Sequence, residues 1–104
     1  MVDSALYVSQ ANKALALQAV EMAQIRHRWA ESREWIRCAL HRHALHFFDS
    51  LCATISEPRN RATMFGAAVE ALRREGRVEA VTARDHQDGA AVEAVYYRIP
   101  GDEA

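Results

Sequence analysis

The sequence contains very little lysine, glycine and proline. Lys13 is its single lysine beside 12 arginines among 104 residues, and the first proline and the first glycine are Pro58 and Gly66. An arginine at any one position is therefore weak evidence for a selected phosphate ligand, because lysine is hardly used anywhere. The long stretch without helix breakers, rich in alanine, leucine and glutamine, favours helices in the first half of the chain.

Cysteines and long apolar runs are scarce as well. Cys38 and Cys52 form no CxxC pair, which argues against a disulfide framework and a zinc site, so we expect two reduced core thiols. No apolar run approaches the roughly 18 residues that a membrane span needs, and residues 1–4 begin no recognisable signal peptide. We therefore expect a cytoplasmic protein that does not contact membranes.

The composition that remains is typical of one globular domain. Half of the residues are apolar and 26% are charged, and 104 residues leave no room for a two-domain enzyme. The sequence has no recognisable nucleophile and base pair, glycine-rich phosphate loop or pair of carboxylates in an apolar setting. We expect no enzymatic activity and no cofactor.

The charge is close to balanced overall but unevenly distributed. The net charge of −1 falls short of that of a dedicated nucleic-acid binder. Residues 24–46 and residues 59–78 each carry five arginines against two glutamates, whereas residues 79–104 carry six acidic side chains against two arginines. Such a field can orient a protein on a polyanion, although solvated helix faces explain it equally well.

A heptad pattern marks the first thirty residues as a helix with one narrow apolar seam. Four apolar residues recur every seventh position and are the predicted dimerisation residues: Val8, Leu15, Met22 and Trp29. Such a seam suits a coiled-coil pair of two copies, which makes a homodimer the favoured assembly. Packing of the same helix on its own domain is the alternative, because Gln18 interrupts the seam.

The rest of the chain predicts three more helices and a hairpin. Apolar spacing indicates helices at 32–45 and 48–55, and a further helix at 61–75 with Asn60 as its N-cap and Gly76 as its left-handed C-cap. The apolar period then changes to two at 77–83 and 92–99, around the turn pair Asp88-Gly89.

This order predicts a mostly α fold with a C-terminal β-hairpin, namely a winged helix-turn-helix with an N-terminal helical extension. An unrelated α+β arrangement with the hairpin laid on the helices is the alternative. The expected divisions are residues 1–30 as an N-terminal helix, 31–100 as the winged-helix domain and 101–104 as a disordered tail.

Residues of the second half also carry a resemblance. Phe65-Gly66-Ala67-Ala68-Val69, the run from Leu72 to Val78 and the closing Tyr96-Tyr97-Arg98-Ile99-Pro100 resemble small winged-helix proteins of bacterial phages and prophages, notably actinobacterial ones. The resemblance covers about residues 46–100 and implies a DNA-associated regulatory or accessory role, such as transcription regulation. The acidic C-terminal region departs from the pattern of a strong DNA binder.

The candidate DNA-binding residues surround the helix at 61–75. The N-terminal end of a recognition helix enters the major groove, where arginine pairs with guanine and asparagine with adenine. The predicted double-stranded DNA contacts are Arg59, Asn60, Arg61, Thr63, Arg73, Arg74, Arg77 and Arg84. If Asn60 is only the helix cap, it reads no base.

Two other patterns compete with this interpretation. His41, His43 and His46 form an H-x-H-x-x-H cluster, but no carboxylate or cysteine stands beside them at a ligating spacing, so we predict no metal site. The near-neutral charge and the apolar N-terminal helix also suit a winged helix that acts as an adaptor or inhibitor and binds a host or replication protein instead of DNA.

Overall fold

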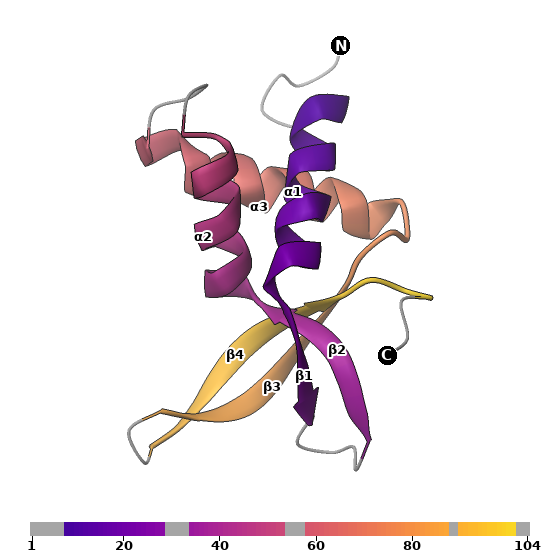
Figure 1. The fold of residues 1–104 in the computed structure, drawn as a ribbon, viewed down its shortest axis with the longest axis vertical. Helices are drawn as coiled ribbons and strands as arrows, with labels where there is room; N and C mark the ends of the chain where they lie inside the picture. The colour runs from indigo at the N-terminus through magenta and orange to yellow at the C-terminus, as the bar shows by residue number, and fades with distance from the viewer. Residues whose placement is uncertain (1–7, 29–33, 54–57, 88–89, 102–104) are drawn as a thin grey trace.

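Three helices gather at one end of the molecule, and two β-hairpins extend from the other end (Figure 1). The computed structural model describes residues 8–28, 34–53, 58–87 and 90–101. The elements in chain order are α1 (Gln10–Ala23), β1 (Gln24–Arg28), β2 (Trp35–Leu40), α2 (His41–Leu51), α3 (Pro58–Arg74), β3 (Glu79–Gln87) and β4 (Ala90–Arg98).

The four strands form one antiparallel sheet in the order β1-β2-β4-β3. The predicted C-terminal hairpin is confirmed: β3 pairs with β4 from Glu79 opposite Arg98 to Gln87 opposite Ala90. A second hairpin, β1–β2, was not predicted. The two hairpins are joined where Ala39 and Leu40 of β2 lie opposite Tyr97 and Tyr96 of β4.

Helix α1 is shorter than the heptad pattern predicts. It begins after Ser9, whose Oγ accepts a hydrogen bond from the backbone N–H of Asn12 at 3.1 Å, as an N-cap does. It ends at Ala23, so the prediction of helix through residue 30 is wrong for the residues of β1. A segment of five residues is too short to show either period, and here pairing with β2 determines the outcome.

The predicted helices at 32–45 and 48–55 are also corrected. Trp35–Leu40 is strand β2, and a single helix, α2, covers His41–Leu51. Residues 36, 38 and 40 alternate along the strand, a period of two that the apolar spacing of the whole segment concealed. Residues 54–57 lie outside the described part of the chain.

Helix α3 begins earlier than predicted and ends where it was expected to end. Pro58 occupies its first position, which suits a residue that has no N–H to donate, so Asn60 lies inside the helix and the N-cap prediction is wrong. At the other end Gly76 has a φ of 73°, its N–H donates to the carbonyl of Arg73, and the N–H of Arg77 donates to that of Leu72. These bonds form the predicted glycine C-cap.

The main core lies between the helices and one face of the sheet. Helix α1 supplies Ala16, Ala19, Val20 and Ala23, and its small side chains let it pack closely on α2 and α3. Aromatic side chains fill the centre, where the Phe48 and Phe65 rings lie 5.2 Å apart and Tyr97 closes the sheet side. A second, smaller cluster of Cys38, Leu40 and Tyr96 lies on the other face. Both cysteines are buried free thiols, as predicted.

The heptad residues separate into two environments. Val8 and Leu15 are partly buried against the main core, whereas Met22 is 47% exposed. Trp29 lies outside the described residues. The seam therefore serves internal packing in its first half, and among the described heptad residues Met22 alone is open to a partner copy.

The two glycines of α3 and its C-cap should respond in opposite ways to substitution. Gly76→Val should lower the free energy of unfolding by about 1 kcal/mol or more, because a β-branched residue is strained at positive φ. Gly66→Ala should raise it by up to about 1 kcal/mol, because a Cβ there meets no atom within 4 Å and alanine favours helix. Urea denaturation monitored by circular dichroism measures both, and a neutral Gly76→Val would contradict the cap.

Dimerisation through α1 can be separated from internal packing by two substitutions. If two copies pair there, Met22→Glu should give a folded monomer, because Met22 is exposed within one chain. Leu15→Glu should instead lower the thermal midpoint, because Leu15 packs against the core. Light scattering gives the mass of each variant, and a monomeric wild-type protein would show that the seam has only an internal role.

Candidate nucleic-acid interface

Helix α3 presents one face to solvent and buries the other. Phe65, Ala68, Val69 and Leu72 are buried against the other helices. The exposed face carries Asn60, Thr63, Gly66, Glu70, Arg73 and Arg74. Four of the eight predicted DNA contacts thus lie on one accessible surface. Between Asn60 and Glu70, this surface carries the small residues Thr63 and Gly66.

Arg61, in contrast, points into the protein. It is only 7% exposed, its Nη1 donates to Asp49 Oδ1 at 2.9 Å and to the Asp49 carbonyl at 3.2 Å, and its Nη2 donates to the Ala53 carbonyl at 3.4 Å. The guanidinium therefore holds the start of α3 against the last turn of α2, where carbonyl groups without helical partners favour a cation. A role in base contact would require this ion pair to break.

The Arg61–Asp49 ion pair also affects the neighbouring Cys52 thiol. Burial raises the pKa of Cys52, a shift that Arg61 opposes and Asp49 reinforces. The thiol is thus held in its unreactive protonated form. The sequence did not predict this ion pair, because Asp49 and Arg61 are 12 residues apart on different helices and no local pattern reports which arginine points inward.

The arginines at the C-terminal end of α3 are exposed and paired with carboxylates. Arg73 Nη1 lies 3.0 Å from Glu70 Oε2, and Arg74 Nε lies 3.7 Å from Glu70 Oε1. Arg77 Nη1 lies 3.6 Å from Glu75 Oε1, and Glu75 Oε2 accepts a hydrogen bond from Lys13 Nζ at 2.7 Å. This hydrogen bond from Lys13 is the main cause that lowers the pKa of Glu75. Exposed pairs of this kind are weak, so a phosphate can replace the carboxylate.

Arg59 and Arg84 are two further predicted contacts. Arg59 belongs to the first turn of α3 and Arg84 to β3, opposite Glu93 of β4. Their side chains lie outside the described part of the structure. Their roles stay predictions.

A partly buried hydrogen bond connects α2 to the sheet. His41 Nδ1, at the start of α2, and the Tyr97 hydroxyl, on β4, are 2.6 Å apart. The His41 ring also lies 5.5 Å from the Phe65 ring of α3. Burial lowers the pKa of His41 and raises that of Tyr97, so both groups are held neutral, and the hydroxyl donates to Nδ1 when that nitrogen carries no proton.

The other histidines of the H-x-H-x-x-H cluster do not join His41. His43 and His46 are exposed on α2. Within residues 8–28, 34–53, 58–87 and 90–101, no three His, Cys, Asp or Glu side chains are grouped so that they could hold a metal ion.

None of the helices in those ranges combines the length and the apolar character needed to cross a membrane.

Comparison with known proteins gives no relative: no protein-family model matches the chain, and neither a curated protein nor a solved structure matches it significantly.

The partly buried His41 should make stability depend on pH. Its folded pKa is lowered, so the unfolded chain binds the proton more readily, and stability is complete above about pH 6.5 and falls as the pH decreases below that value. His41→Asn should reduce this dependence, because asparagine does not titrate. Thermal midpoints between pH 5 and pH 8 test it, with His43→Asn as the exposed control that should keep the wild-type slope.

Proposed function

We propose that the protein is a winged helix-turn-helix protein that binds double-stranded DNA through α3. The observation that carries the proposal is the strand pairing. The second of the two strands between α1 and α2, β2, pairs with β4, which is the second strand of the hairpin that follows α3. A winged helix needs this arrangement, since the shared sheet fixes the wing beside the helix-turn-helix.

The geometry of α2 and α3 supports the same proposal. The Arg61–Asp49 ion pair and the Phe48–Phe65 contact fix the two helices against each other, while the opposite face of α3 stays open. Helix α3 crosses behind α1 and α2 in Figure 1, so its outward face is not covered by either. A helix held in this way and exposed on one side can enter a major groove.

The contacts are divided by their position along α3. Asn60 and Thr63, near the N-terminal end, are the candidates for base edges, and Arg73, Arg74 and Arg77 are the candidates for phosphates. Glu70 is the one acidic side chain on the described exposed face of α3, and it lies between these two groups. Its negative charge opposes the approach of DNA, so binding requires that Arg73 and Arg74 exchange Glu70 for phosphate.

One observation favours the alternative function, contact with another protein. Met22, Ile25 and Trp35 are large apolar side chains that are 47%, 49% and 51% exposed, and they lie at the end of α1 and in the β1–β2 hairpin. Large exposed apolar side chains are typical of protein contact surfaces, and the strand register places Ile25 and Trp35 on opposite faces of this hairpin. An adaptor or inhibitor would use the hairpin and the end of α1 and leave α3 free. The phage-type resemblance fits either function and stays a prediction.

DNA binding should respond oppositely to two substitutions on α3. Arg74→Gln should weaken binding to all duplexes alike and lower the slope of log affinity against log salt by about one, because one phosphate contact is lost. Glu70→Gln should strengthen binding to all duplexes, because it removes a repelling charge and releases two arginines. Fluorescence anisotropy with a random-sequence duplex at several salt concentrations measures both effects.

Glu21→Gln is the matched control, because it makes the same charge change at the end of α1 instead of on α3. It should change the affinity much less than Glu70→Gln. If the two have equal effects, only the net charge matters and α3 is not the interface. A wild-type protein that binds no duplex at low salt would overturn the DNA proposal and place protein contact first.

A further inference from the structure

A hollow with charges of both signs lies on the side of the sheet beside the end of α1. It has a volume of about 560 Å³ and is lined by Glu21, Gln24, Arg37, Ile99, Pro100 and Gly101. These residues come from the last turn of α1, the start of β1, the middle of β2 and the segment after β4. The volume falls within the range of small-molecule sites.

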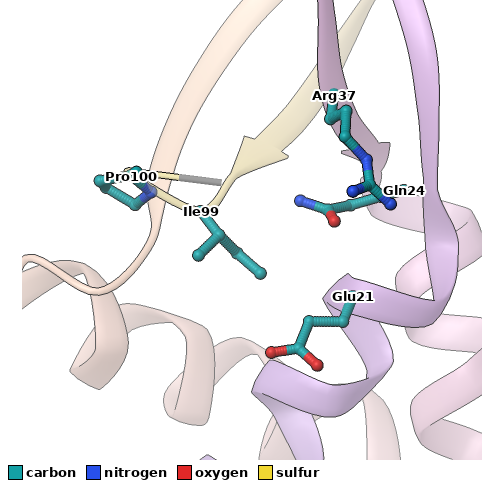
Figure 2. A pocket seen from close by; sticks show the side chains of 6 residues that line it. Glu21, Gln24, Arg37, Ile99 and Pro100 are labelled. Atoms are coloured by element: carbon teal, nitrogen blue, oxygen red, sulfur yellow. The ribbon is translucent and has the colours of Figure 1, made fainter. Parts of the chain in front are cut away.

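The polar groups stand on two sides of the hollow. In Figure 2 the Gln24 amide lies beside the Arg37 guanidinium, and the Glu21 carboxylate lies across from them, with Ile99 facing the space between. Gln24 and Arg37 share a face of the sheet because Gln24 lies opposite Ala39, two residues beyond Arg37. The hollow thus offers donors on one side and a carboxylate on the other.

Gln24 carries an unmet requirement. Its Nε2 is buried and, among the described residues, has no hydrogen-bond partner. Native proteins satisfy nearly all buried polar groups, so an acceptor from outside the chain, either a water or a ligand, would complete this donor. The backbone N–H of Gln24, unlike its side-chain amide, has a partner: it donates to the Glu21 carbonyl and caps α1.

The end of α1 adds to the charge pattern. The carbonyl groups of the last turn give a helix C-terminus partial negative charge, which favours a cation there. Glu21 belongs to this last turn and adds its carboxylate to that negative charge. A ligand that meets both sides carries an ammonium group and a carboxylate a short distance apart.

We propose that this hollow binds a small zwitterion of the α-amino acid class. The ligand carboxylate accepts from Arg37 and from Gln24 Nε2, after a small rotation of that amide, and its ammonium group donates to Glu21. Ile99 and Pro100 contact a short apolar side chain. The site shares no lining residue with the exposed face of α3, so the proposal does not depend on DNA binding.

The probes for the test are L-leucine and its two halves. 4-Methylpentanoate lacks the ammonium group of leucine, and 3-methylbutylamine lacks its carboxylate. In a titration of the full chain followed by NMR, leucine should shift the amide resonances of Gln24, Arg37 and Gly101. Each half should bind about tenfold or more weakly, because a charge-assisted hydrogen bond is lost. Equal binding of 4-methylpentanoate, or no shift at these residues with leucine, would overturn the proposal.

Substitutions assign the two ends of the ligand. Arg37→Gln should sharply reduce the preference for leucine over 3-methylbutylamine, because Gln24 alone then donates to the carboxylate. Glu21→Gln should abolish the preference for leucine over 4-methylpentanoate. The matched controls are Arg74→Gln and Glu70→Gln, which make the same changes in the separate hollow between α3 and β3. If the controls weaken leucine binding as much as the site variants, the effect is one of overall charge and the site is wrong.

Gln24→Met distinguishes a ligand contact from a structural role. Methionine has a similar length and no donor, so the variant should fold with an unchanged or higher thermal midpoint, because the buried unpaired Nε2 is removed. The same variant should bind leucine about threefold or more weakly. A variant that loses stability and keeps its leucine affinity would show that Gln24 serves the fold alone.

Discussion

The fold depends on a short pairing between β2 and β4, in which Ala39 and Leu40 lie opposite Tyr97 and Tyr96. This pairing joins two hairpins that would otherwise be separate, and two-stranded hairpins alone are at best marginally stable in water. It also brings Tyr97 against His41 and Phe65, so that the sheet meets α2 and α3 in one aromatic cluster. The neighbouring Tyr96 serves the other face, where its ring stacks on that of His27 at 4.4 Å.

The position of α3 against α2 has a different origin. Arg61 forms an ion pair with Asp49 and hydrogen bonds to carbonyl groups at the end of α2. About half of the Asp49 side chain remains exposed to solvent. The partly exposed partner limits the desolvation cost that makes a fully buried ion pair a poor source of stability. The same arginine that sequence reasoning assigned to DNA thus serves to present the rest of α3.

The sequence predicted the features that a local pattern encodes. Gly76 as a cap, the change to a period of two after it and the inward residues Phe65, Ala68, Val69 and Leu72 all follow from neighbouring positions, and the structure has them. The β1–β2 hairpin was missed because residues 24–28 and 35–40 are strands only through pairing with each other and with β4. In the candidate site, the inward turn of Arg61 and the hollow beside Gln24 both bring together residues that are distant in sequence, and no periodicity reports such contacts.

The pairing of Ala39 with Tyr97 spans 58 positions of the chain. Closing so long a loop costs entropy before any contact across it is gained, and that cost grows only slowly with length, by about 0.6 kcal/mol for each doubling. The helices and both hairpins, in contrast, form mainly from contacts between near neighbours in sequence. The order of folding therefore follows from the topology: local elements form early, and the junction between β2 and β4 sets the rate at which they become one structure.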